Sequence, residues 1–235
     1  MPAKTRLHVI ASRTHKWLAI IIGIQLLLWF ASGAVMSFFP IDEVHGDHLV
    51  NRQRVEALDP GAIVAQPGAF GAKPIESLTF RMLLDRPVAE VTSAGAVTLY
   101  DAASGQPIGP VSAATAQEVA RKAWLGAPGT QATTDTVTAK STEYRGPVPA
   151  WRVAFADPDH TRVFVDQATG RITAVRTGTW RLYDFFWGLH IMDWKNHENF
   201  NSPWLLGFAI GGLVLWLGGA VLLYFRWPRR RRRRS

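Results

Sequence analysis

The chain has no cysteine among its 235 residues. Disulfide bonds, a thiol nucleophile, cysteine-ligated iron–sulfur clusters and C-x-x-C-H haem attachment are therefore excluded. The sequence also lacks a G-x-S-x-G nucleophile motif and a glycine-rich phosphate-binding loop. No catalytic residue is predicted, and the question of an enzymatic activity stays open. If there is one, it is that of a haem-dependent reductase subunit.

Charged residues are missing from two long apolar runs, residues 17–39 and 203–224. At about 1.5 Å per helical residue, each run can cross a hydrocarbon core of about 30 Å. A cleaved signal peptide is the alternative for the first run, but the apolar part of such a peptide has only about 7–15 residues. The sequence therefore predicts two retained transmembrane helices, 17–39 and 203–226, with the lipid bilayer as a partner.

The net charge of +8 comes from the two ends of the chain. Lys and Arg flank both apolar runs, and the tail is a run of arginines. Residues 42–198 hold 15 Lys and Arg with all 18 Asp and Glu. The positive-inside rule places both termini in the cytoplasm of a bacterial inner membrane and the central segment in the periplasm. Nucleic-acid binding is not predicted, because the folded segment itself is not basic.

The central segment contains an internal repeat. Residues 99–108 and 164–172 both read as a strand, an Asp-x-x-[Ser/Thr]-Gly turn and a second strand. Asp accepts hydrogen bonds from the turn backbone, and Gly allows a positive φ. Alternating runs at 78–84 and 151–155 indicate further antiparallel strands, 115–124 a short helix capped by Thr115, and 128–146 a connecting loop. The predicted fold class is α+β.

These motifs carry a family resemblance. Pro149-Ala-Trp-Arg-Val-Ala-Phe155 with Val163-Phe-Val-Asp-x-x-Thr-Gly-Arg171 resembles the PepSY domain. Arg13-x-His-Lys-Trp17 with the following span resembles the PepSY-associated transmembrane family. Larger relatives have about four spans and are linked to ferric-siderophore reduction through membrane haem. The resemblance implies a membrane-anchored periplasmic domain and draws attention to His15 and His190, which match family positions.

Histidines also gather at the predicted outer ends of the two spans. His45 and His48 follow the first span, whereas His190 and His197 precede the second. Imidazoles are axial ligands of haem iron, so these four residues and His15 are candidate ligands of a b-type haem. His15 lies at the inner end and cannot share an iron with His190. An inner haem would need a homodimer or a larger membrane partner.

Residues 180–202 are predicted to form an amphipathic helix. A helical projection places His190 and His197 on one aromatic stripe and places Asp184 on a different face of the helix. The stripe indicates either an aromatic anchor among lipid headgroups or the wall of a haem site. His45-x-x-His48, with neighbouring carboxylates, is a candidate copper or zinc site.

Six segments follow from these patterns: a cytoplasmic N-terminus at 1–16, a first span at 17–39, a periplasmic PepSY-like domain at 40–179 (repeats at 58–110 and 115–176), an interfacial segment at 180–202, a second span at 203–226 and a cytoplasmic tail at 227–235.

The leading functional prediction is an anchored periplasmic binding or regulatory module for a membrane or periplasmic partner, with control of a peptidase as one version. The alternatives are a haem-carrying electron-transfer subunit in iron uptake or respiration, and periplasmic copper or zinc handling.

Overall fold

The structure is a computed structural model and describes residues 3–52, 54, 56–71 and 74–226. The chain divides into two compact units. The first, called the membrane unit below, combines the N-terminal residues up to Phe38 with the chain from Asp184 onward. The second, called the sheet domain, runs without interruption from Phe39 to Tyr183. The predicted cytoplasmic tail at 227–235 lies outside the described residues.

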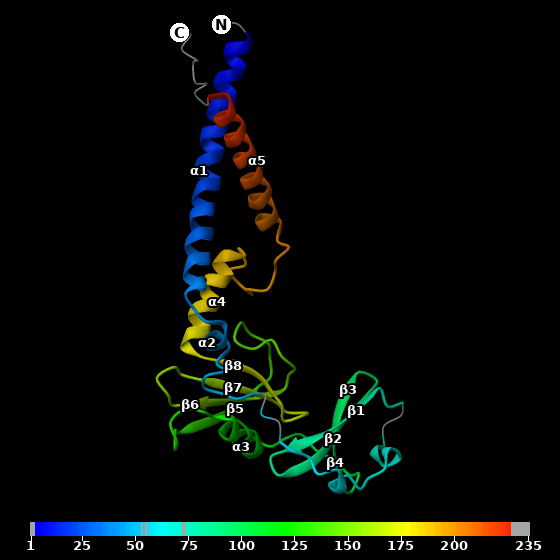
Figure 1. Cartoon of the computed structure of the whole chain (residues 1–235). Coiled ribbons are helices and arrows are strands. Elements are labelled where there is room, and N and C mark those ends of the chain that lie inside the picture. The colour runs from blue at the N-terminus through cyan, green and yellow to red at the C-terminus, as the bar shows by residue number, and fades with distance from the viewer. Residues whose placement is uncertain (1–2, 53, 55, 72–73, 227–235) are drawn as a thin grey trace, which may run out of the picture. The chain divides into compact units, whose positions relative to one another are not determined.

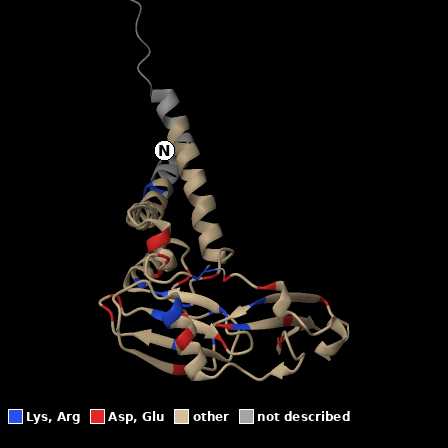
Figure 2. Ribbon diagram, turned by 60° about the horizontal axis from the view of Figure 1, so that its bottom comes forward, with Lys and Arg blue, Asp and Glu red and all other residues tan. Residues whose placement is uncertain are grey.

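Two long helices form most of the membrane unit, α1 (Ala3–Ser37) and α5 (Pro203–Arg226). Both are long and apolar enough to cross a membrane. They lie side by side in Figure 1, and residues of α1 contact residues of α5. Large apolar side chains such as Phe30 and Trp216 are about two-thirds exposed or more, as lipid-facing residues would be. In Figure 2 the charged residues spread over the sheet domain, whereas residues 203–225 hold none.

Glycines of α5 allow its close approach to α1. A Cβ at Gly211 would lie 2.8 Å from Cδ1 of Ile22, and one at Gly218 would lie 3.9 Å from Cε1 of His15. Gly207, which the sequence places in the same G-x-x-x-G pattern, has nothing within 4 Å of its Cβ position. The contact face therefore includes Gly211 and Gly218 but not Gly207.

The sheet domain consists of two four-stranded antiparallel sheets, each a meander in chain order. The strands of the first are β1 (Ser77–Leu83), β2 (Arg86–Ser93), β3 (Ala96–Asp101) and β4 (Pro107–Ile108). Those of the second are β5 (Ala132–Val137), β6 (Ala150–Phe155), β7 (Arg162–Asp166) and β8 (Ile172–Arg176). Short helices precede and join the sheets: α2 (Ile41–His45), the 3₁₀ helices η1 (Pro60–Ala62) and η2 (Pro67–Phe70), and α3 (Ala113–Ala123).

One apolar core joins the two sheets. Val88 and Leu99 of the first sheet, Val153 and Val163 of the second, and Ala120 of α3 belong to the same cluster of buried side chains. Strands β2 and β7 each have four consecutive buried residues, so both faces of these interior strands are covered. The α+β fold class predicted from the sequence is confirmed.

The repeated turns have the predicted chemistry. The Asp101 carboxylate accepts hydrogen bonds from the backbone N–H of Ala103 and Ser104, and Gly105 has a φ of 72°. Asp166 accepts the hydroxyl hydrogen of Thr169, and Gly170 has a φ of 71°. Each turn joins the third and fourth strands of its sheet. The repeat in the sequence is therefore a repeat of the two meanders.

Two local predictions are wrong, and one strand was missed. Residues 132–137, expected in a loop, form edge strand β5, because their Thr-rich sequence is β-branched and pairs with β6. Strand β2 was not predicted, although it lies inside the first sheet. Helix α3 is capped by Ser112 rather than Thr115, since the Ser112 hydroxyl accepts a hydrogen bond from the Thr115 N–H.

Helix α4 (Gly178–His190) is shorter than the predicted helix over 180–202. The chain then turns, with φ values of 56° at Met192 and 57° at His197. Asp193 stabilises this turn by accepting hydrogen bonds from four backbone N–H groups, those of residues 195, 196, 198 and 199. His197 is consequently not on the helix, and the predicted stripe does not extend beyond His190.

Candidate functional site

His190 is fixed against the first long helix. Its Nδ1 lies 2.9 Å from the hydroxyl oxygen of Ser32, which is almost fully buried. The Ser32 hydroxyl also donates to the Leu28 carbonyl at 2.7 Å, and in the His190 tautomer with its proton on Nδ1 the imidazole donates to the same hydroxyl oxygen. In that tautomer Nε2 carries the lone pair. This is the nitrogen that an iron or another metal would take.

His197 is oriented in the same way by a carboxylate. Its Nδ1 lies 2.6 Å from Oδ2 of Asp184, a residue that is 8% exposed. The ring lies over Gly188, where a Cβ would come within 2.4 Å of Cδ2, and the His197 carbonyl accepts a hydrogen bond from Trp187 Nε1. The prediction that Asp184 points away from the histidines is wrong. The turn after α4 reverses the chain and brings His197 back to it.

His15 lies at the other end of α1. Seventeen residues separate it from Ser32, the partner of His190, which corresponds to about 25 Å along a helix. The His15 side chain is exposed and lies beside Gly218 of α5. His15 and His190 therefore cannot ligate one iron. The sequence led to the same prediction.

His45 and His48 belong to the sheet domain. His45 ends α2, and both side chains are exposed. Gly46 between them has a φ of 75°, and a Cβ there would lie 2.7 Å from Val175 of β8. In the part of the chain that the structure describes, no three His, Asp or Glu side chains are grouped in a way that could hold a metal ion.

A pocket that was not predicted from the sequence lies in the sheet domain, with a volume of about 310 Å³. It is formed by residues 51, 52, 54 and 56, the end of β1, the end of α3 and the start of β8. The charged side chains that line it are Arg52, Arg54, Glu56, Arg81, Lys122 and Arg171. Met82, Leu83, Val119 and Ile172 are among its apolar lining residues.

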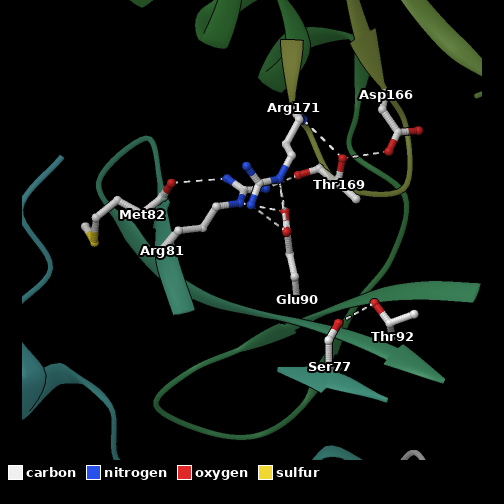
Figure 3. Close-up of polar contacts among 8 residues, drawn as sticks. All are labelled: Ser77, Arg81, Met82, Glu90, Thr92, Asp166, Thr169 and Arg171. Carbon is white, nitrogen blue, oxygen red and sulfur yellow. Dashed lines mark hydrogen bonds and ion pairs between the residues drawn. The ribbon is translucent and has the colours of Figure 1, made fainter. Parts of the chain in front are cut away.

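A buried carboxylate joins the two sheets at this pocket (Figure 3). Glu90 of β2 accepts hydrogen bonds from Arg81 Nε at 2.6 Å and from Arg171 Nη2 at 2.7 Å. Arg81 also donates to the carbonyls of Met82 and Thr169. The Thr169 hydroxyl donates in turn to Asp166, so the turn before β8 is held in place. Arg171 and Thr169 belong to the second repeat, whereas Arg81 and Glu90 belong to the first.

The two guanidinium groups decide the charge state of Glu90. Burial by itself opposes ionisation of this carboxyl, but hydrogen bonds and charge from Arg171 and Arg81 outweigh it and lower the pKa of Glu90 below its usual value. Burial lowers the pKa of Arg81, against the opposing effect of Glu90. The sequence contained one signal for this residue: Glu90 is an acidic side chain within the otherwise apolar run 87–91.

Comparison with known proteins gives one result. A family model described as the PepSY-associated TM region matches residues 12–235. No curated protein and no solved structure matches the chain. The match covers most of α1, all of α5 and both sheets, so it agrees with the resemblance seen in the motifs. The chain belongs to the family of the PepSY-associated TM region.

Proposed function

We propose that this chain is an anchored binding or regulatory module of the bacterial inner membrane, with its sheet domain in the periplasm. The single observation that supports the proposal is the pocket of about 310 Å³ in the sheet domain. Its volume is at the lower end of the range for ligand sites, and it combines apolar walls with a few charged groups. The two long helices would hold this pocket near a membrane or periplasmic partner.

The chemistry of the pocket favours binding over catalysis. Its charged side chains are arginines, one lysine and one glutamate. Lys122 donates to Glu56 at 2.9 Å and to Asp85 at 3.0 Å, and these hydrogen bonds raise the pKa of Lys122. A lysine held as a cation cannot act as a base or nucleophile. Such a site recognises a partner by its charge.

The proposal is tested by site-specific photo-cross-linking in cells. A photoreactive amino acid at Ile172, which lines the pocket, should give one discrete adduct with the full-length chain. The same group at Val97, an exposed residue of β3 that does not line the pocket, is the matched control and should not give that adduct. Absence of an adduct at Ile172, or the same adduct at both positions, would overturn the proposal.

A second candidate function, that of a b-type haem electron-transfer subunit, is favoured by the two oriented histidines. With the proton on Nδ1, beside Ser32 in one case and Asp184 in the other, the Nε2 lone pair of His190 and of His197 is available. Metal-bound histidines are commonly oriented in this way. When bound, haem would supply one-electron chemistry, and His190 and His197 would hold its iron.

An absorption spectrum of the detergent-purified chain tests this second candidate. After expression with haem, a bound b-type haem should give a Soret band that sharpens on reduction by dithionite. His190→Ala and His197→Ala should each remove it. His160→Asn is the control, because His160 lies in a turn of the sheet domain with a φ of 48°, which Asn tolerates. A spectrum with protein absorption only, in native membranes as well, would exclude the haem function for a single chain.

A further inference from the structure

We propose that the pocket of the sheet domain receives a carboxylate of an acidic peptide segment, with Arg54 and Arg171 as its principal ligands. This inference rests on the proposed function and specifies the chemistry of the partner. It starts from the charges on the pocket wall. Five cations line the pocket with one acid, Glu56.

All five lining cations have an acidic partner, and the longest of these pairs joins Arg54 Nε to Glu56 Oε1 at 3.9 Å. Arg52 pairs with Asp47 at 2.6 Å, Lys122 pairs with Glu56 and Asp85, and Glu90 lies between Arg81 and Arg171. One of these acids, Asp85, has a side chain that is 94% exposed and is therefore well screened by water. Because Glu90 neutralises only one of its two arginines, the pocket keeps an excess of positive charge.

Two arginines retain hydrogen-bond donors for a ligand. Arg171 donates to Glu90 through Nε and Nη2, so Nη1 remains for another acceptor, and half of its side chain is exposed. Arg54 donates through Nη1 to the Lys122 carbonyl, and its Nε lies 3.9 Å from Glu56, so Nη2 remains for a ligand, and 55% of its side chain is exposed. Arginine groups of this kind recognise acidic motifs, because the guanidinium fork matches two carboxylate oxygens.

The structure contains an example of this recognition in Glu90. Its carboxylate accepts hydrogen bonds from two guanidinium groups, one from each repeat (Figure 3). A ligand carboxylate in the pocket would meet the opposite side of Arg171 together with Arg54. Met82, Val119 and Ile172 would contact the apolar part of the same segment. Such contacts require a carboxylate attached to carbon chains, as in a peptide.

The experiment uses matched neutral and acidic probes. An acetylated, amidated tetrapeptide with one central glutamate is titrated against the full chain in nonionic detergent and followed by saturation-transfer NMR. The same peptide with glutamine is the neutral probe, and a version with a free C-terminus and glutamine tests the other source of a carboxylate. We expect saturable binding of at least one acidic probe, roughly tenfold tighter than the neutral one.

Two variants show whether the pocket is responsible. Arg54→Gln should weaken binding of the acidic probe roughly tenfold and bring it to the level of the neutral probe. Arg86→Gln removes the same charge from an arginine that pairs with Asp101 and does not line the pocket, so it should bind as the unaltered chain does. Equal binding of acidic and neutral probes, or equal weakening by both variants, would overturn the inference.

Failure of this inference is distinguishable from failure of the proposed function. If the adduct at Ile172 forms in cells but the probes show no preference for charge, the module binds a partner by other contacts and the inference is wrong. If the probes bind as expected and the adduct does not form, the carboxylate site stands and the proposed function is wrong.

Discussion

At the scale of single residues, Glu90 links the two repeats of the sheet domain through Arg81 and Arg171. It is one carboxylate shared by two guanidinium groups, and its side chain is only 11% exposed. A buried charge of this kind is stable only while its partners remain, because removing one leaves the others desolvated and unpaired. Glu90 therefore couples the first sheet to the turn that precedes β8.

The first prediction concerns the replacement Glu90→Gln. The amide keeps the shape of the side chain but leaves buried Arg81 without a counter-charge, so the free energy of unfolding at pH 7 should fall by about 2 kcal/mol. Glu76→Gln makes the same chemical change at an exposed residue and should alter stability by less than about 0.5 kcal/mol. Thermal unfolding of the full chain in detergent measures both. Equal stability of the two variants would contradict the role given to Glu90.

The second prediction is the pH dependence that follows from the same carboxyl. The pKa of Glu90 is lower in the folded state than its ordinary value of 4.5. Its stabilising contribution is therefore complete above about pH 4.5 and is lost as the pH falls through the lower, folded-state pKa. The melting temperature of the unaltered chain should fall below about pH 4.5. Glu90→Gln should show a smaller fall over the same range, and an identical fall would count against the assignment.

At the scale of elements, the sequence predicts best where a pattern is local. The two apolar runs and the Asp-x-x-[Ser/Thr]-Gly turns were found because each depends on neighbouring residues. The end of α4 was missed because the aromatic pattern of residues 180–202 is also compatible with a longer helix. The turn depends on Asp193, whose carboxylate accepts hydrogen bonds from backbone N–H groups. These bonds, above all those from Glu198 and Asn199, lower the pKa of Asp193. A lone Asp in a helical pattern does not reveal this.

The third prediction tests how this turn seats His197. Gly188→Ala would place a Cβ 2.4 Å from Cδ2 and 2.6 Å from Nε2 of the His197 ring. The ring would be displaced and its hydrogen bond with Asp184 weakened, at a cost of about 1–3 kcal/mol. Gly207→Ala, at a helical glycine with nothing within 4 Å, is the control and should not destabilise the chain. Thermal unfolding in detergent compares the two variants.

A double-mutant cycle identifies the cause of that effect. If the clash with the imidazole is responsible, the cost of Gly188→Ala should largely disappear in a chain that already carries His197→Ala. If the cost is unchanged there, the effect comes from the helix itself, and His197 does not lie over Gly188.

At the scale of the whole molecule, the candidate sites join residues that are far apart in the sequence. Eighty-one residues separate Glu90 from Arg171, and 158 separate Ser32 from His190. No local pattern connects such pairs, and strand β2, which carries Glu90, was itself not predicted. The sequence could therefore predict His190 and His197 as candidates from their type and position, but not the partners that orient them. The pocket could not be predicted at all.

The last prediction concerns how the chain is placed in the membrane, and the absence of cysteine makes it directly testable. Ala103→Cys puts a single thiol in the exposed turn between β3 and β4 of the sheet domain, and Ser235→Cys puts one at the end of the arginine tail. The arginines should keep the tail in the cytoplasm. A membrane-impermeant maleimide should therefore label Ala103→Cys in intact spheroplasts and label Ser235→Cys only after lysis. The unaltered chain, which has no thiol, gives the background. Labelling of Ser235→Cys before lysis would place the tail outside. It would also remove the periplasmic position on which the proposed partner binding depends, because two spans put the tail and the sheet domain on opposite sides.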